Sequence, residues 1–324
     1  MNQPLTLDEA AAVVLDSGAE LRAGGTDTTA RRRGGVTRSA AVQIPLLPAL
    51  HGITRQADGT TRIGALTGVA ELSDDPGLQA DYPALTRTAG ALATPQIRTA
   101  GTLGGNLLQH NRCWYYRNPH FSCYRDGGEG CPARTGIHLH AAVIDQGPCI
   151  APHPSSIAIA LLSYDARIDV HELGTLSVAD LYGDGSDPTR DHLLAPQQIL
   201  TAVTLPAPLS GERAAYNRAI SRAGAEWPLV EAVARVSVSD GIVTAAGVAA
   251  GGIAHTPLRL PEVEDALLGR EPTPEILFTA ATAATERCSP LPQTRYKVEL
   301  LRDTVLDVLE KAVGAEAPTR AETN

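Results

Sequence analysis

Four of the five cysteines lie within 37 residues, in a segment that interrupts an otherwise regular pattern of strands and helices. Residues 111–149 hold a Trp-Tyr-Tyr triplet, several histidines and arginines and many turn formers, but no apolar period of two or 3.6. We interpret this segment as an irregular insertion. In a chain without an export signal, such a cluster indicates metal or redox chemistry rather than disulfides.

The spacing of these four cysteines, C-x9-C-x7-C-x17-C, leaves the metal open. Four thiolates suit a tetrahedral zinc ion or an iron–sulfur cluster, and the frequency of structural zinc sites favours zinc slightly. Zinc sites usually contain close C-x2–4-C pairs, however, and none occurs here. Two disulfides would require export. Cys288 stands far from the others and is interpreted as a lone structural cysteine.

Two glycine-rich turns, Ala23-Gly-Gly-Thr-Asp27 and Gly101-Thr-Leu-Gly-Gly-Asn106, are the second informative feature. Successive glycines let backbone N–H groups approach an anion, and a threonine hydroxyl adds a donor. Either turn alone is most simply a tight turn. Neither matches GxGxxG or the P-loop, which disfavours a Rossmann site and a nucleotide triphosphatase. Together they predict two loops that close on one dinucleotide from different sides.

Hydrophobic periodicity predicts an α+β fold for the remaining chain. Helices are expected at 7–15, 69–72, 83–92, 261–268, 275–286 and 296–313, and strands at 20–23, 40–44, 62–65, 197–205, 230–238 and 242–250. Further apolar segments, of unassigned type, lie at 157–162 and 167–170. Thr6 and Glu9 form a capping-box pattern before the first helix, and Asp240-Gly241 is a strong hairpin signal. Residues 206–211 resemble a linker.

Charge and hydropathy exclude several classes of partner. The 27 basic residues set against 36 acidic ones give a net charge of −9, so no basic field suits nucleic acid or anionic lipid. No apolar run reaches the roughly 18 residues of a membrane span. Residues 1–12 lack the basic and apolar regions of a signal peptide. We therefore expect a cytoplasmic chain, unless a partner carries it elsewhere.

Three motifs in order carry a family resemblance: Leu21-Arg-Ala-Gly-Gly-Thr-Asp27, Ile63-Gly-Ala-Leu66 and Ala93-Thr-Pro-Gln-Ile-Arg-Thr-Ala-Gly-Thr-Leu-Gly-Gly-Asn-Leu107. They resemble the FAD-binding (medium) subunit of the molybdenum hydroxylases, the group of xanthine dehydrogenase, carbon monoxide dehydrogenase and aldehyde oxidoreductase. The resemblance covers nearly the whole chain, including Glu226-Trp-Pro228.

The family resemblance implies a fold as well as a cofactor. The expected fold is a two-part N-terminal FAD-binding domain of the vanillyl-alcohol-oxidase (PCMH-like) type. A C-terminal domain like that of the CO dehydrogenase flavoprotein, an antiparallel sheet with helices, would follow it. We place the units at 1–55, 56–206 with the insertion at 111–149, and 212–315, with a tail at 316–324.

Cofactor contacts follow from the resemblance by position. Six residues would wrap the FAD pyrophosphate: Ala23, Gly24, Gly25, Thr26, Asp27 and Thr28. Six others would line the opposite side of the cofactor: Leu92, Ala93, Thr102, Gly105, Asn106 and Leu108. Ser155 would be a polar contact, Leu200 an apolar wall and Arg218 a basic group near the flavin. Trp227 either lies near the flavin or, from its size, is a core residue.

Two local features qualify this assignment. The family usually has Pro-Ser-Asp where this chain has Pro154-Ser155-Ser156. The missing carboxylate, worth roughly 1.5–3 kcal/mol if it meets the cofactor, predicts weaker flavin binding or a substitute from elsewhere. Arg31, Arg32 and Arg33 follow the first glycine turn and are interpreted as a solvated helix face rather than a phosphate site.

A minority of the family carries a cysteine insertion at this point that binds a 4Fe–4S cluster, including the 4-hydroxybenzoyl-CoA reductase and bacterial aldehyde oxidoreductase types. Residues 107–113 and 149–154 look most like the aldehyde oxidoreductase type. The resemblance implies four cluster ligands: Cys113, Cys123, Cys131 and Cys149. Trp114, Tyr115, Tyr116 and Tyr124 would shield the cluster.

In the family that this chain resembles, a large subunit holds the molybdenum cofactor and a small subunit holds two 2Fe–2S clusters. Electrons reach the FAD of the medium subunit and leave to an external acceptor. The expected function is therefore that of an FAD and 4Fe–4S electron-transfer subunit. No acid–base pair is evident among the histidines, so no catalytic residue is assigned. The alternatives are a stand-alone FAD-dependent oxidoreductase acting on a small molecule, and a zinc-stabilised binding module without FAD.

Overall fold

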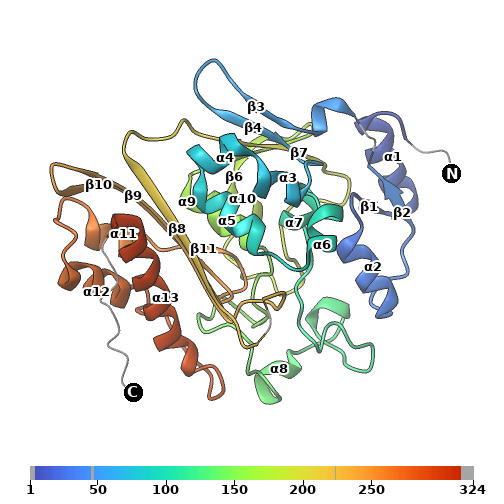
Figure 1. Ribbon diagram of the computed structural model, residues 1–324. Helices are drawn as coiled ribbons and strands as arrows, with labels where there is room; N and C mark the ends of the chain where they lie inside the picture. Colours follow the sequence, from blue (N-terminus) through green and yellow to red (C-terminus); the bar gives the residue numbers. More distant parts are fainter. Residues whose placement is uncertain (1–3, 45–46, 223, 315–324) are drawn as a thin grey trace.

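A computed structural model describes residues 4–44, 47–222 and 224–314, so the predicted tail at 316–324 lies outside the described residues. Its strands form three sheets (Figure 1). One is a parallel pair. One has five antiparallel strands in the order β3 (Ile53–Arg55), β4 (Thr61–Gly64), β7 (Leu200–Leu205), β5 (Arg167–Val170) and β6 (Gly174–Ser177). One has four antiparallel strands in the order β11 (Leu258–Arg259), β10 (Ile242–Gly251), β9 (Val230–Ser239) and β8 (Glu212–Ala219). The expected α+β fold with a C-terminal antiparallel sheet is confirmed.

The N-terminal unit begins with the predicted capped helix, α1 (Leu7–Ser17). The Thr6 hydroxyl accepts a hydrogen bond from the N–H of Glu9 at 3.1 Å, and Gly18 ends the helix in the left-handed region with φ 63°. The strands β1 (Glu20–Arg22) and β2 (Ala41–Gln43) pair in parallel, and α2 (Thr26–Arg33) connects them. The first glycine turn therefore leads directly into a helix.

The central unit packs helices on the five-stranded sheet. Its elements are η1 (Pro48–Leu50), β3 (Ile53–Arg55), β4 (Thr61–Gly64), α3 (Val69–Asp74), α4 (Pro76–Asp81), α5 (Pro83–Ala91), α6 (Pro95–Ala100), α7 (Leu103–Leu107), α9 (Ser156–Ser163), β5 (Arg167–Val170), β6 (Gly174–Ser177), α10 (Val178–Tyr182) and β7 (Leu200–Leu205). Every residue of α9 is buried, as its nearly continuous apolar sequence requires. Strand β3 pairs with β4, so the central sheet begins before residue 56. The three-unit division stays a prediction.

The insertion is irregular, as its sequence indicates. Between residues 111 and 149 the described chain forms only the short helices η2 (Tyr124–Asp126) and α8 (Pro132–Thr135). Near its end, Val143 and Ile144 join the core of the C-terminal unit, and both donate their N–H groups to the carbonyl of Ile253, at 2.8 and 2.9 Å. The insertion is therefore tied to the C-terminal unit as well as to the central one.

The C-terminal unit is an antiparallel sheet with helices. Its elements are β8 (Glu212–Ala219), β9 (Val230–Ser239), β10 (Ile242–Gly251), β11 (Leu258–Arg259), α11 (Pro261–Leu267), α12 (Pro274–Ala283) and α13 (Tyr296–Val313). The predicted hairpin turn is confirmed, with φ 51° at Asp240 and 79° at Gly241. Helix α13 buries its apolar stripe against β8 and β9, and α5 and α9 lie against the same sheet from the central unit (Figure 1).

Among the helices of the described residues, none has the length and apolar content that crossing a membrane requires.

Candidate functional site

The two glycine turns meet in space. A Cβ atom on Gly24 would lie 1.7 Å from the carbonyl oxygen of Ala100, so only glycine lets the two turns touch here. Gly25 follows with φ +72° and forms the N-cap of α2. The first turn therefore needs its two glycines for two different reasons, one for close approach and one for backbone conformation.

The two turns offer different hydrogen-bond donors. At the N-terminus of α2, the first N–H groups have no acceptor within the helix and face a cavity. In the second turn, the N–H of Leu103 donates to Thr67 at 2.9 Å, that of Gly104 to Ala65 at 2.8 Å, and that of Gly105 to the Thr102 hydroxyl at 3.2 Å. The first turn can thus cradle an anion with its backbone, whereas the second is a capped helical turn whose N–H groups are occupied.

Two cavities adjoin where the two glycine turns contact each other. The first cavity, of about 610 Å³, lies along β1 and α2, and the second, of about 510 Å³, extends toward the C-terminal unit. Thr26, Thr102 and Gly105 line both. The predicted contacts Ala23, Gly24, Gly25, Asp27, Thr28, Leu108 and Leu200 line the first cavity, and Leu92, Ala93, Asn106 and Arg218 line the second. All predicted cofactor residues except Ser155 therefore line one or the other of these two adjoining cavities.

Asp27 is the electrostatic centre of this region. Its carboxylate accepts hydrogen bonds from the His110 N–H at 3.1 Å, from Arg117 at 2.9 Å, and from Arg112. Burial works against its charge, but the His110 side chain, whose Nδ1 lies 3.3 Å from the carboxylate, and the two guanidinium groups outweigh burial and hold the pKa of Asp27 well below its usual range. The side chain of Asp27 thus holds arginines in place and is not itself open to a ligand.

Arg31 corrects an expectation. We expected a solvated helix face, but Arg31 is buried, ion-paired with Glu20 and hydrogen-bonded to Asp27 at 3.2 Å. Arg32 and Arg33 are exposed, as expected. The basic groups gathered at the first turn are therefore Arg31, Arg112 and Arg117, two of which come from the insertion.

Ser155 acts through a neighbour. Its hydroxyl donates to Asn106 at 2.6 Å and accepts from the N–H of Ala158 at 3.2 Å, so it caps α9 while it orients Asn106 at the second cavity.

Trp227 is 46% exposed and lines the second cavity, with the Arg112 guanidinium 4.9 Å from its ring centre. The alternative that Trp227 is a core residue is wrong.

A carboxylate stands beside Ser156 although the sequence has none at that position. Ser156 is fully buried next to Glu231, which projects from β9 and accepts a hydrogen bond from the Tyr216 hydroxyl at 2.8 Å. Burial raises the pKa of Glu231, and no cation pairs with it within the described part of the chain. Sequence patterns missed Glu231 because it occupies one position of a strand that is buried on both faces.

The four predicted ligand cysteines come together. Cys113, Cys123, Cys131 and Cys149 line one small cavity of about 20 Å³, together with Tyr115, Tyr116 and Tyr124 but without Trp114. Burial raises the pKa of the thiols of Cys113, Cys123 and Cys149, and backbone N–H groups directed at each sulfur partly oppose this rise. Cys288 does not line this cavity.

Arg125 links the cysteine cavity to the first cavity, since its side chain lines both. It pairs with the buried Asp191, and its guanidinium lies 4.9 Å from the ring centre of Tyr116. Arg125 and Asp191 are 66 positions apart, and Tyr116 and Arg125 both lie in the irregular insertion. No sequence motif could therefore have identified these contacts.

Comparisons with known proteins identify the family of the chain. Residues 1–208 match the family described as "FAD binding domain in molybdopterin dehydrogenase", and residues 214–315 match "CO dehydrogenase flavoprotein C-terminal domain". The chain is 35% identical over 263 residues to the aldehyde oxidoreductase FAD-binding subunit PaoB of Escherichia coli K12, covering 78% of this chain and 79% of that one. It is 26% identical over 315 residues to the carbon monoxide dehydrogenase medium chain of Hydrogenophaga pseudoflava, covering 96% and 94%.

Solved structures share the fold. A chain of carbon monoxide dehydrogenase from Hydrogenophaga pseudoflava superposes with a TM-score of 0.77 at 23% identity, covering 98% of this chain and 97% of that one. A chain of quinoline 2-oxidoreductase from Pseudomonas putida 86 gives a TM-score of 0.74 at 20% identity, covering 96% and 95%. With both family matches and the 35% identical relative, the chain belongs to the FAD-binding medium subunits of the molybdenum hydroxylases and is an FAD-dependent oxidoreductase subunit.

Proposed function

We propose that this chain carries both FAD and a 4Fe–4S cluster as the electron-transfer subunit of a molybdenum-dependent hydroxylase of the aldehyde oxidoreductase type. It would take electrons from 2Fe–2S clusters of a partner and deliver them to an external acceptor. The observation that carries this proposal is the convergence of four cysteines on one cavity, which shares Arg125 with a cavity formed by the glycine turns.

The residues at the turns suit an extended dinucleotide. The open N–H groups of α2, with Arg112 and Arg117 beside them, would hold a pyrophosphate. The first cavity would receive one half of FAD against Leu108 and Leu200, and the second cavity the other half against Leu92, Ala93 and Asn106. When bound, the flavin supplies the ability to take up single electrons and release them singly or in pairs.

The spacing of the thiols supports a cluster over zinc. Thiolates bound to one tetrahedral zinc at about 2.3 Å would lie about 3.8 Å apart. Among the described residues, only Asp8, His171 and Glu172 form a group of three potential ligands whose ligand atoms lie within 4.8 Å of one another, so no three of these sulfurs are that close. A cluster of four irons stands between its thiolates and needs such wider spacing. Backbone N–H groups directed at the sulfurs are also typical partners of iron–sulfur ligands.

Partner subunits complete the proposal. Names such as "carbon monoxide dehydrogenase medium chain" and "6-hydroxypseudooxynicotine dehydrogenase complex subunit alpha" describe relatives that belong to larger assemblies. By analogy, a large molybdopterin subunit would oxidise the organic substrate, and a small subunit with 2Fe–2S clusters would pass the electrons to this chain.

The cysteines provide the decisive experiment. Serine oxygen binds iron more weakly than thiolate, so Cys123→Ser and Cys149→Ser should lose the iron, the sulfide and the broad visible absorption while most of the FAD remains. Cys288→Ser is the matched control and should keep all of these. Anaerobic purification with iron, sulfide and flavin assays makes the measurement.

Two results of the same purification would contradict the proposal. Stoichiometric zinc without sulfide would refute the cluster. Failure to co-purify with molybdopterin and 2Fe–2S subunits, together with oxidation of a small molecule by the chain alone, would support the stand-alone FAD oxidoreductase instead.

A further inference from the structure

One wall of the first cavity is an irregular segment. Residues 183–199, between α10 and β7, form neither helix nor strand, and many of them line the first cavity: 189–192, 194–196, 198 and 199. Because the segment lacks the hydrogen bonds of a helix or a sheet, individual contacts must fix its position. One such contact is made by Asp191, which pairs with Arg125 and accepts a hydrogen bond from Asn111 at 3.1 Å.

His255 makes a second contact with this segment. It lies in the loop after β10 and is only 2% exposed. Its Nδ1 is 3.0 Å from the carbonyl oxygen of Ala151, shortly after Cys149, and its Nε2 is 3.1 Å from the carbonyl oxygen of Arg190. The ring therefore joins the C-terminal unit to the end of the insertion and to the irregular segment. His255 does not line the first cavity itself, so it can affect a ligand there only through Arg190.

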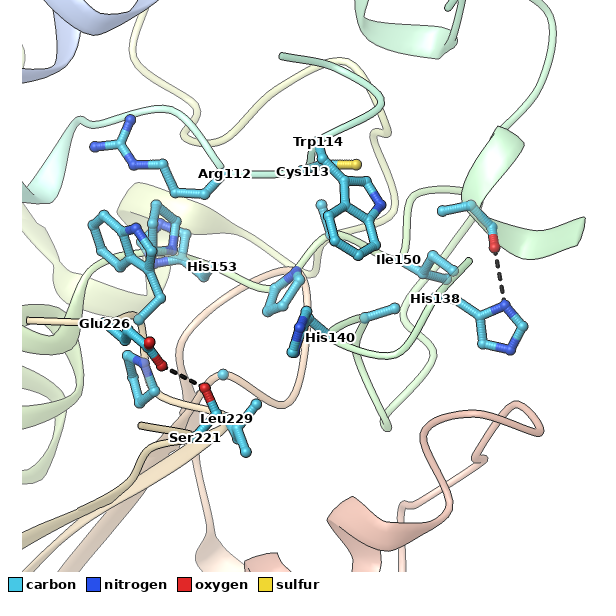
Figure 2. A pocket seen from close by; sticks show the side chains of 18 of the residues that line it. Arg112, Cys113, Trp114, His138, His140, Ile150, His153, Ser221, Glu226 and Leu229 are labelled. Atoms are coloured by element: carbon cyan, nitrogen blue, oxygen red, sulfur yellow. Dashed lines mark hydrogen bonds between the residues drawn. The ribbon is translucent and has the colours of Figure 1, made fainter. Parts of the chain in front are cut away.

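The two carbonyl oxygens require two protons on the His255 ring. A carbonyl oxygen only accepts hydrogen bonds, and a neutral imidazole has a single N–H, so a neutral ring would turn a lone pair toward one of the oxygens. His138 shows the neutral arrangement: its Nδ1 lies 3.1 Å from the carbonyl oxygen of Ala133 (Figure 2), and its Nε2 accepts the N–H of Gln293 at 3.3 Å. Since both nitrogens of His255 face acceptors, the geometry fits an imidazolium.

A buried carboxylate compensates for this charge. Asp191 follows Arg190 directly, and although burial works against its charge, Arg125 and the nearby histidines, His255 among them, lower the pKa of Asp191 overall. The other titratable group that acts on His255 is His153, whose pKa burial lowers to about 3, so that its ring stays neutral. His255 is thus a buried cation beside an anion that belongs to the same segment.

We propose that His255 is a buried imidazolium and a positioning residue for FAD, because its two N–H groups fix the irregular segment as a wall of the first cavity. This inference rests on the proposed function, in which that cavity receives one half of FAD. Loss of either proton leaves the carbonyl of Ala151 or that of Arg190 without its donor. The segment is then held less firmly, and FAD binds more weakly to the protein with a neutral His255.

The pH dependence of FAD binding tests the charge, because imidazole is the side chain that commonly titrates near neutral pH. The full-length chain in its complex is freed of flavin and titrated with FAD at about pH 6 and about pH 9, with flavin fluorescence as the measure of the Kd. The Kd of the parent should rise about tenfold between them, the effect of one lost hydrogen bond to a buried carbonyl.

His255→Gln keeps an N–H donor but cannot carry the charge. Its Kd should already be raised at the lower pH and should lack the tenfold rise, whereas a purely structural role would leave the pH profile unchanged. Other histidines titrate in both proteins, so the difference between the two profiles belongs to His255. His51→Gln, at an exposed histidine elsewhere, is the matched control and should follow the parent.

Amide hydrogen exchange of the parent keeps the test decisive if His255→Gln fails to fold. Measured before FAD is added, the protection of residues 183–199 should fall severalfold from the lower to the higher pH, after correction for the intrinsic rate, whereas β9 and β10 stay protected. Equal pH profiles of the Kd in the parent and His255→Gln, or unchanged protection of 183–199, would overturn the positioning role. Failure of the parent to bind FAD at either pH would refute the proposed function, whereas FAD binding without pH dependence would refute this inference alone.

Discussion

At the scale of single residues, Asp27 shows how a motif residue works in this protein. It lies in the glycine turn where a phosphate would bind, yet its carboxylate is already occupied by Arg112, Arg117 and the His110 N–H. The carboxylate therefore fixes the positive groups that a pyrophosphate would meet. It also fastens the insertion to the N-terminal unit, since both arginines come from the insertion.

Asp27→Asn tests this role through the pH dependence of stability. The pKa of Asp27 is lowered in the folded protein, so its contribution is present above the unfolded value of about 3.9 and is lost as the pH falls below it. The variant should lose about 3 kcal/mol at pH 7, because two buried guanidinium groups lose their partner, and should show a flatter acid limb. Thermal unfolding from pH 7 to pH 3 measures both. Asp16→Asn, on the exposed face of α1, serves as the control; an unchanged acid limb in Asp27→Asn would remove Asp27 from this role.

Glu231 determines what a carboxylate at position 156 would do. Because Ser156 is buried beside Glu231, Ser156→Asp would place two carboxyl groups in one apolar site, at a cost of about 3 kcal/mol. We expect a lower Tm and weaker FAD retention on gel filtration. The double variant Ser156→Asp with Glu231→Gln should recover most of both losses. If Ser156→Asp alone tightened FAD binding, the two carboxyl groups would not conflict at this site.

At the scale of elements, strong hydrophobic periodicity, helix caps and turn residues were sufficient to predict a helix or a hairpin. The capped helix α1, the hairpin at Asp240-Gly241 and the amphipathic α13 follow the patterns that predicted them. Helices α6 and α7 were not predicted, because five- and six-residue helices containing Pro95 or Gly104 and Gly105 show no apolar period. Buried Leu103 and Leu107 stabilise α7 through tertiary packing, which a local pattern does not contain.

The site was predictable to the extent that its residues form compact motifs. The two glycine turns led to residues that line two adjoining cavities, and four cysteines spread over 37 residues converge on one small cavity. Apart from Arg31, the partners of Asp27 lie more than 80 positions away, and Glu231 meets Ser156 across two elements. Such long-range pairs arise from the tertiary fold, so a single sequence carries no sign of them.

The contact between the two glycine turns gives a prediction at this scale. A methyl group on Gly24 would overlap the Ala100 carbonyl, so Gly24→Ala should push the turns apart and remove most of the FAD after gel filtration. Gly90→Ala is the control, because its Cβ would lie 3.6 Å from Ser73 in ordinary contact within α5. Full flavin occupancy of Gly24→Ala would show that the contact is not needed.

At the scale of the whole molecule, Lys297 fastens the insertion to the C-terminal unit. Its buried Nζ donates to the carbonyl of Gly252 at 2.8 Å and to that of His140 at 3.3 Å. Burial lowers the pKa of Lys297 to about 7, below the unfolded value of about 10.4. The unfolded chain therefore binds more protons between these values, and stability rises with pH in this window.

Lys297→Met should remove that rise. We expect the free energy of unfolding of the parent protein to increase by about 2–4 kcal/mol from pH 7 to pH 9.5 relative to the variant. Denaturant titrations at four pH values measure the difference. Lys311→Met, at an exposed ion pair on α13, is the control and should follow the parent. Parallel pH profiles for the parent and Lys297→Met would mean that Lys297 keeps its ordinary affinity for protons.

The arginines that close the flavin cavities have a consequence for how such a protein is made. Arg112, Arg117 and Arg125 share one segment with the four cysteines, so a metal centre bound by these cysteines would also hold part of the lining of the first and second cavities in place. In the cell, iron starvation would then leave a protein whose nucleotide-site arginines are less firmly held, and iron delivery would restore their order.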